Sequence, residues 1–148
     1  MRISVKGRYA LAAMIYMAAN YDSRENITVI RIAERLGSSK IYLEQIFSLL
    51  KRGGLLNSVK GAQGGYQLAR LPRQITASDI LSAVELSLFE ETKDTVSENA
   101  PEIDKAIRLS VFDVLDEKIK ATLESITLES LVLAAETHRT DDKMMFYI

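Results

Sequence analysis

Cysteine is absent from this 148-residue chain and histidine occurs once, so several kinds of site are excluded at the outset. Without thiols the chain has no disulfides, thiolate zinc sites, catalytic thiols or cysteine-held iron–sulfur clusters. One histidine leaves little for a histidine-rich metal site or a Ser/His/Asp triad. Two prolines and seven glycines exclude collagen-like and low-complexity chains. We therefore expect a protein with no metal, no iron–sulfur cluster and no other cofactor.

Long hydrophobic runs are also missing. No apolar run reaches the roughly 18 residues that a membrane span needs. The N-terminal sequence MRISVKGRYA is basic but lacks the apolar stretch of a signal peptide. The composition, with 47% hydrophobic and 26% charged residues, is that of a chain that buries a core. We expect one domain, with or without an appendage, no membrane contact and a cytoplasmic location.

The net charge of −1 conceals two halves of opposite sign. Residues 1–73 carry 12 basic and 4 acidic side chains, a formal charge of +8, whereas residues 74–148 carry 7 and 16, a charge of −9. A half this basic favours a polyanionic partner, although a solvated basic face accounts for the charge equally well. The acidic half argues against nucleic acid wrapping the whole molecule.

The basic half contains two short predicted helices, joined by a tight turn. Thr28 can cap a helix over 29–36, which Gly37 ends, and Ser39 can cap a second over about 40–52. Helices joined by a turn containing glycine are typical of a helix-turn-helix, although any small helical bundle can produce the same pattern.

A predicted hairpin follows directly, with strands at 55–59 and 66–68 around a basic, glycine-rich tip at 60–65. A helix-turn-helix followed by such a hairpin is a winged helix. A nucleotide phosphate loop at the tip is disfavoured, because there is no Gly-Lys-Ser/Thr and no following helix.

Two further helices are predicted beside this unit. Residues 4–20 form one that is apolar nearly all round and hence buried. Thr76 caps another that ends at about Val84.

The acidic half predicts a long amphipathic helix. An acidic loop over 86–100 precedes apolar residues that recur at three- and four-residue spacing through 102–123, about 33 Å of helix. A short helix from 128 to about 136, a polar stretch and an apolar tail at 144–148 follow. The long helix has more apolar surface than a small domain covers, which favours a dimer, with packing inside one chain as the alternative. The candidate dimerisation residues are Ile103, Ile107, Val111, Val114, Leu115 and Ile119.

The predicted fold class is therefore mainly α, a winged helix-turn-helix domain with a small β-hairpin wing and a long C-terminal dimerisation helix. The expected divisions are a DNA-binding domain at 1–84, a loop at 85–100, and a region at 101–148 holding the dimerisation helix, a short last helix and the tail.

Several stretches resemble the Rrf-two family of bacterial winged-helix transcription regulators, over nearly the whole chain. They are MRISVKGRYAL at 1–11, YLEQI at 42–46, LLKRGGL at 49–55, SVKGAQGGY at 58–66 and ITASDI at 75–80. The cluster-binding members carry three cysteines in the loop before the long helix, and residues 86–104 contain none here. The chain is thus most similar to the cysteine-free branch, in particular to the family's cysteine-metabolism repressor, whose end resembles residues 145–148. It departs from the family in having Leu86 after Glu85 and an apolar Ile41 where polar residues are common.

The resemblance implies three groups of DNA contacts. The start of the first helix contacts phosphates, the start of the third reads bases in the major groove, and the wing reaches the minor groove or backbone. The residues concerned are Arg2, Ser4, Lys6, Tyr9, Ser39, Lys40, Tyr42, Glu44, Gln45, Lys60, Gly61, Gln63, Gly64 and Gly65. Core packing for Tyr9 and an ion pair for Glu44 are equally open. Gly64 and Gly65 are expected to be structural, and Tyr66 to pack beneath the wing.

The expected function is that of a homodimeric DNA-binding repressor, not an enzyme, on pseudo-palindromic operators in double-stranded DNA. The resemblance implies a role in cysteine metabolism with cysteine synthase (O-acetylserine thiol-lyase) as a partner. That enzyme would capture the tail, Phe146, Tyr147 and Ile148, which could instead pack on its own dimer. The alternatives are control by a small molecule at 86–100 and a winged-helix adaptor that binds protein without DNA.

An enzyme is disfavoured by the remaining polar residues. Glu90–Glu91 and Asp141–Asp142 are adjacent pairs in predicted loops, and adjacent side chains do not converge on one point. His138 is expected to face solvent near the end of the last helix.

Overall fold

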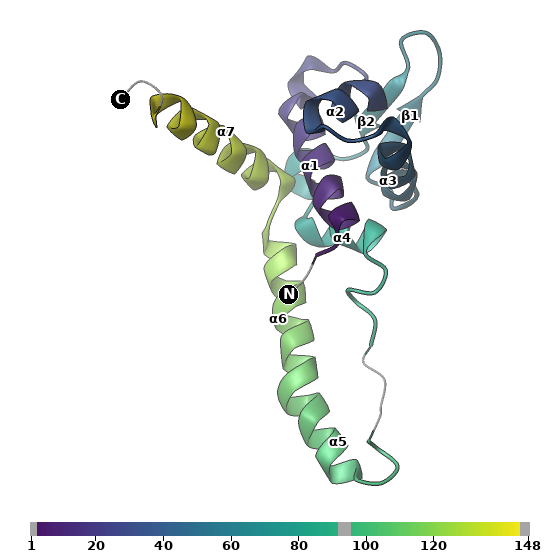
Figure 1. The fold of residues 1–148 in the computed structure, drawn as a ribbon, viewed down its shortest axis with the longest axis vertical. Helices are drawn as coiled ribbons and strands as arrows, with labels where there is room; N and C mark the ends of the chain where they lie inside the picture. Colours follow the sequence, from purple (N-terminus) through teal and green to yellow (C-terminus); the bar gives the residue numbers. More distant parts are fainter. Residues whose placement is uncertain (1–2, 92–95, 146–148) are drawn as a thin grey trace.

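The computed structural model describes residues 3–91 and 96–145, which form a compact domain and a long helical projection (Figure 1). We call the compact part, from residue 3 to residue 84, the winged-helix domain. The projection consists of α5 (Pro101–Ile107), η3 (Arg108–Phe112) and α6 (Asp113–Ser125), and we call it the arm. The last helix, α7 (Leu128–Met145), leaves the domain in a different direction from the arm.

Helix α1 (Val5–Ala19) is the centre of the domain. Its cap is Ser4, whose Oγ accepts a hydrogen bond from the backbone N–H of Gly7 at 3.1 Å. The small residues Ala10 and Ala13 are fully buried, which lets the neighbouring helices approach closely, and Met14 fills the space beside them. The predicted buried helix over 4–20 is confirmed to within one residue at each end.

The helix-turn-helix is formed by α2 (Val29–Leu36) and α3 (Lys40–Arg52), with the predicted bounds. Thr28 Oγ1 accepts a hydrogen bond from Arg31 N at 3.2 Å, and Ser39 Oγ accepts one from Tyr42 N at 3.1 Å. Gly37 ends α2 in the left-handed conformation with φ of 67°, which glycine adopts without steric cost. Local capping chemistry therefore defines both helices.

The wing consists of β1 (Leu56–Val59) and β2 (Gly65–Leu68), antiparallel with Leu56 opposite Leu68 and Val59 opposite Gly65. The predicted hairpin is confirmed, with β1 beginning one residue later and β2 one residue earlier than expected. A bridge between Ile27 and Tyr66 attaches the wing to the segment before α2. A Cβ on Gly65 would lie 2.7 Å from the carbonyl oxygen of Ile27, so this approach requires glycine.

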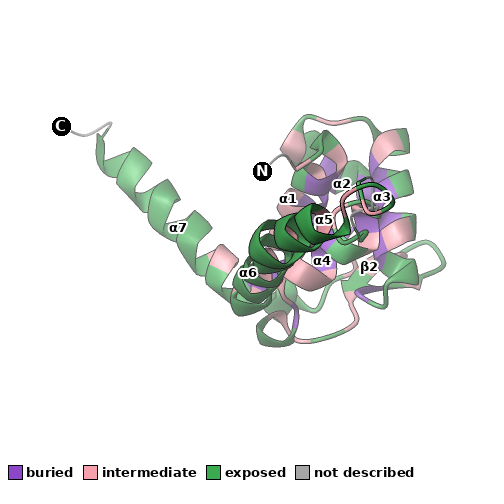
Figure 2. Ribbon diagram, turned by 90° about the horizontal axis from the view of Figure 1, so that it is seen from below, coloured by how far each residue is buried: buried purple, intermediate pink, exposed green. Residues whose placement is uncertain are grey.

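The core lies almost entirely inside the winged-helix domain. Phe47 is fully buried and packs edge-on against Tyr66, with ring centroids 5.0 Å apart. Among the described residues only Leu128 is a buried side chain outside this domain (Figure 2). No described polar or charged side chain is buried. The largest fully buried side chains are Phe47, Met14, Ile27, Ile32, Leu43, Ile46, Leu50, Leu55, Leu56, Ile75, Ile80 and Leu81.

Helix α4 (Ala77–Val84) closes the domain after a short turn, η2 (Pro72–Gln74). Thr76 and Asp79 form a capping box, in which each side chain accepts a hydrogen bond from the other's backbone N–H, at 3.0 and 3.1 Å. The predicted helix ending at Val84 is confirmed.

Two backbone hydrogen bonds join the end of the arm to the domain. Ala77 N donates to Ile126 O and Leu128 N donates to Ile75 O, both at 2.8 Å. Leu128 enters the core at the same point, so the junction between α6 and α7 is held by packing as well as by hydrogen bonds.

The arm corresponds to the helix predicted over 102–123, with one difference. Residues 108–112 have π-helical hydrogen bonding, so α5 and α6 are separated by a wider turn. Such turns depend on side-chain packing and tertiary surroundings and have no signature in the apolar spacing.

The short last helix was predicted wrongly. It runs to Met145 and not to about Glu136, so the expected polar stretch and Met144 belong to it. The residues after Glu136 include no glycine or proline, so nothing stops the helix. The hydroxyls of Thr137 and Thr140 donate to carbonyls one turn earlier and so fit within the helix. Within the described ranges, no helix has both the length and the apolar character needed to cross a membrane.

Candidate nucleic-acid interface

The start of α3 is exposed while its opposite face forms the core. Lys40, Glu44 and Gln45 are exposed, and Leu43 is fully buried. Lys40 Nζ lies 3.6 Å from a carboxylate oxygen of Glu44, one helical turn away. Glu44 thus forms an ion pair, which is one of the two roles predicted for it. The exposed face is free to enter a groove, because packing already fixes the helix from behind.

Tyr42 and Tyr9 join the first and third helices. Both rings are half-buried, and they pack edge-on with centroids 5.8 Å apart. Tyr9 therefore has the packing role that the sequence left open. The contact holds the start of α3 against α1, so the two predicted DNA-contacting segments form one surface.

At the start of α1, Ser4 makes a contact within the chain that the sequence did not predict. Lys6 is half-buried, and Arg2 lies outside the described residues. Ser4 is exposed, yet its backbone N–H and its hydroxyl both donate to Glu85 Oε1. The groups of Ser4 that were expected to meet a phosphate therefore already have an acceptor within the chain.

The wing tip presents Lys60, Gly61 and Gln63 to solvent, and the hairpin holds them there. Asn26 Nδ2 donates to the carbonyl oxygen of Gln63 at 2.8 Å, which anchors the tip. A Cβ on Gly64 would overlap the Val59 carbonyl oxygen, so Gly64 is structural, as is Gly65.

Tyr66 packs against Phe47 beneath the wing, as expected.

Ile41 lies beside the predicted contact residues of α3, although the sequence motifs do not mark it as a contact. It is 72% exposed in the first turn of α3, between Lys40 and Tyr42. An apolar side chain there suits the methyl group of a thymine. Its position beside the helix cap was the available signal, since the first turn of such a helix meets the bases.

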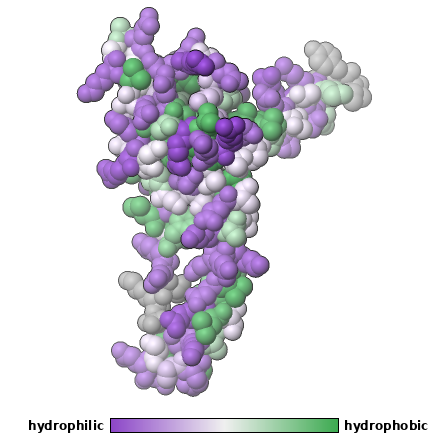
Figure 3. Space-filling view, turned by 180° about the vertical axis from the view of Figure 1, so that it is seen from behind, coloured by the Kyte–Doolittle hydropathy of each residue, from purple (hydrophilic) through white to green (hydrophobic). Residues whose placement is uncertain are grey.

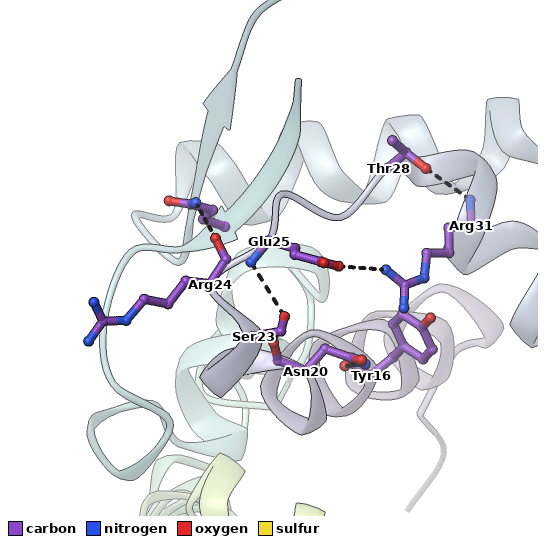
Figure 4. A network of polar contacts seen from close by, with 8 residues as sticks. Tyr16, Asn20, Ser23, Arg24, Glu25, Thr28 and Arg31 are labelled. Carbon is purple, nitrogen blue, oxygen red and sulfur yellow. Dashed lines mark hydrogen bonds and ion pairs between the residues drawn. The ribbon is translucent and has the colours of Figure 1, made fainter. Parts of the chain in front are cut away.

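A polar network fixes the turn between α1 and α2, which includes η1 (Tyr21–Ser23) (Figure 4). Asn20 Nδ2 donates to Tyr16 O at 2.8 Å, and a carboxylate oxygen of Glu25 lies 3.7 Å from Arg31. The Arg31 guanidinium lies 5.9 Å from the centre of the Tyr16 ring. These contacts orient α2, and they form no pair of groups suited to acid–base chemistry.

Five of the six predicted dimerisation residues are exposed, and Figure 3 shows apolar atoms at the surface of the arm. Ile103 is 54% and Leu115 52% exposed, and only Ile119 of the set is half-buried. Helices α5 and α6 and the π turn contain no buried residue. The arm therefore projects apolar side chains that its own chain leaves uncovered. The tail residues Phe146, Tyr147 and Ile148 lie outside the described residues.

Comparison with known proteins agrees with this geometry. A sequence profile of the Rrf2, or Rrf-two, family, described as iron-dependent transcriptional regulators, matches residues 3–134. The chain is 38% identical over 144 residues to the HTH-type transcriptional regulator IscR of Xenorhabdus nematophila, which covers 97% of this chain and 86% of that protein.

The residues present do not fit iron held by cysteine or by a cluster of other ligands. The chain has no cysteine, and its one histidine, His138, is exposed on α7. Within residues 3–91 and 96–145 no three His, Asp or Glu side chains are grouped so as to hold a metal ion. The described part of the chain therefore offers no donor set for the iron that the family description implies.

Solved structures extend the likeness to the fold. IscR of T. potens superposes with a TM-score of 0.72 at 36% identity, covering 93% of this chain and 90% of that one. CymR, described as the global cysteine regulator of B. subtilis, gives 0.70 at 32% identity, covering 90% and 98%. These relatives are named as regulators and not as enzymes. With its exposed α3, basic wing and matching profile, the chain belongs to the Rrf2 family of DNA-binding transcriptional regulators.

Proposed function

We propose that this protein is a homodimeric repressor that binds pseudo-palindromic operators and blocks a promoter. The observation that carries the proposal is the division of α3, which buries Leu43 in the core and presents Lys40 and Gln45 to solvent. In this proposal residues 1–84 bind DNA, 85–100 form a loop that receives signals, and 101–148 hold the dimer together.

Base reading is assigned to the exposed face of α3. Gln45 can pair bidentately with adenine, and Lys40 can reach guanine acceptors. Lys60 and Gln63 at the wing tip contact the adjacent backbone or minor groove, and Lys6 neutralises a phosphate at the start of α1. A lysine at the wing tip supplies charge without the fork geometry of arginine, so the wing adds affinity more than sequence preference.

Dimerisation is assigned to the arm. Its exposed apolar residues, including Ile103, Val111 and Leu115, face solvent in the single chain, and a two-fold copy can cover them. A two-fold dimer presents two α3 helices, so its operator consists of inverted half-sites about one DNA turn or more apart.

The test is selection of bound duplexes from a random 30-base-pair pool, followed by sequencing and by binding across a salt series. We expect an inverted repeat, and binding that weakens steeply with salt because phosphate contacts release counterions. A pool that stays random, together with salt-independent binding, would contradict the proposal and favour the adaptor.

Control of cysteine metabolism is the finer proposal. Its support is the absence of cysteine together with the likeness to CymR of B. subtilis. Cysteine synthase would then hold the repressor on DNA through the tail at 146–148. The test measures complex formation between the enzyme and the full chain, with a chain lacking 146–148 as the matched control. Undiminished binding by the shortened chain would remove the tail from the mechanism.

A small-molecule effector is the second candidate, and a pocket of about 460 Å³ favours it. The pocket lies where α4, α6 and the segment after α4 meet, and it combines serine hydroxyls, carboxylates, one lysine and apolar side chains. It is lined by Ser78, Ser82, Leu88, Phe89, Glu91, Asp116, Glu117, Ile119 and Lys120. A set of candidate metabolites that leaves both melting temperature and DNA affinity unchanged would count against it.

A further inference from the structure

The carboxylate of Glu85 lies on the first turn of α1, far from it in the sequence. Glu85 follows the last residue of α4, and its backbone N–H donates to Leu81 O at 2.7 Å. Its Oε1 accepts a hydrogen bond from Ser4 N at 3.0 Å and another from Ser4 Oγ. The side chain thus links the end of one helix to the beginning of another across 81 residues of sequence.

Gly7 makes this contact possible. A Cβ at position 7 would overlap Oε1 of Glu85 and lie 2.7 Å from a side-chain carbon of Ile3. Any larger residue would therefore force the carboxylate away from the helix. The first turn of α1 and the residue that follows α4 are therefore complementary in shape.

The carboxylate accepts hydrogen bonds from the same Ser4 donors that a DNA phosphate would use. The first turn of a helix offers free N–H groups and a partial positive charge, which stabilise one anion. Here that anion is Glu85, and a phosphate approaching Ser4 meets both an occupied donor and a like charge.

Glu85 also immediately precedes the segment 86–91, which contributes residues to the pocket beside α6. Leu88 N donates to Glu85 O at 3.3 Å, and Leu88, Phe89 and Glu91 line the pocket. A displacement of this segment therefore acts directly on the backbone that carries the Glu85 carboxylate.

We propose that Glu85 is an intramolecular competitor for DNA phosphate at the start of α1, and that the segment 86–91 sets DNA affinity through it. The inference rests on the proposed DNA-binding function and adds its regulation. When the segment holds Glu85 on Ser4, each protomer contacts one phosphate fewer. When the segment moves away, the Ser4 N–H and hydroxyl donate to a phosphate oxygen and binding tightens.

The experiment compares Glu85→Gln with Glu90→Gln in the full chain. Both variants lose one negative charge, but Glu90 is exposed in the same segment and does not line the pocket. Binding to a mixed-sequence 30-base-pair duplex is followed by fluorescence anisotropy across a salt series, and thermal unfolding confirms that each variant is folded. Glu85→Ala is a second variant, which removes the acceptor as well as the charge.

We expect Glu85→Gln to bind DNA about two- to fivefold more tightly per half-site than Glu90→Gln. The reason is that losing the carboxylate charge leaves the N-terminus of α1 free for a phosphate. The salt dependence should steepen by about 0.9 per added phosphate contact. Equal or weaker binding by both Glu85 variants, relative to Glu90→Gln, would overturn the inference while leaving the proposed function intact. Salt-independent binding of the unaltered protein would overturn both.

Discussion

The winged-helix domain and the arm are both helical and apolar in sequence, but only the first covers its own apolar side chains. Phe47 and Leu50 in the domain are fully buried, whereas Val114 and Leu115 in the arm are about half exposed. The domain has several helices and a hairpin around α1, while the described contacts of the arm with the domain lie mainly near α4 and the junction with α7. A lone amphipathic helix cannot bury an apolar face wider than its single neighbour covers, and this supports the proposed dimer.

Charge also differs between the winged-helix domain and the arm. Residues 3–73 of the domain carry 11 basic and 4 acidic side chains, and the surplus of acidic residues lies in the half that contains the arm. DNA attracts the first region and repels the second. This division of charge supports the proposal that the domain faces the nucleic acid and that the arm contacts another protein chain.

The same substitution in both regions gives the largest expected contrast. Phe47→Ala should lower the free energy of unfolding by about 3–5 kcal/mol, because it leaves a cavity in a filled core. Phe112→Ala in the arm should lower the free energy of unfolding by no more than about 0.5 kcal/mol at low protein concentration. Denaturant unfolding followed by circular dichroism measures both. Similar losses would mean that the two regions fold as one unit.

A charge among the exposed apolar residues of the arm should break the dimer. Leu115→Asp places two carboxylates in a two-fold interface at about 2 kcal/mol each, which raises the dissociation constant about a thousandfold. Glu124→Lys is the matched control, because nine residues along a helix place it on the opposite face. Light scattering coupled to size exclusion measures the mass. A Leu115→Asp variant with the mass of the unaltered protein would place the interface elsewhere.

Within the domain, α3 and the wing should differ in what they contribute to binding. Gln45→Ala should cost about 1–3 kcal/mol on the selected operator and little on unrelated DNA, because it removes a base contact. Lys60→Ala should weaken binding to all sequences and reduce the salt slope by about one. Anisotropy titrations on both duplexes separate these effects. Equal losses on the two duplexes for Gln45→Ala would argue against base reading.

The smallest expected effect concerns the ion pair of Lys40 and Glu44, whose side chains are 54% and 50% exposed. Glu44→Ala should lower the free energy of unfolding by no more than about 0.5 kcal/mol, since water screens such pairs. Thermal unfolding at low and high salt measures it. A larger loss that persists at high salt would mean that Glu44 has another structural role.

The elements of the domain were predictable because their signals are local. Thr28, Ser39 and Thr76 each cap a helix within three residues, and Gly37 ends one. The extent of α7 was missed because polar residues after Glu136 suggested a loop, although none of them stops a helix. Lys40 and Gln45 of α3 and Lys60 of the wing tip are exposed as their proposed role requires, and the 72% exposure of Ile41 adds a residue that the motifs did not mark.

Residue order alone specified the helix caps, the buried α1, the hairpin, the basic and acidic halves and the lack of any cysteine ligand. Each depends on neighbours in the chain or on composition. The contact of Glu85 with Ser4 and Gly7, the π turn at 108–112 and the uncovered face of the arm were decided by tertiary structure. Such features arise because residues far apart in the chain compete for the same space and the same hydrogen-bond donors, and spacing along the sequence does not record which of them meet.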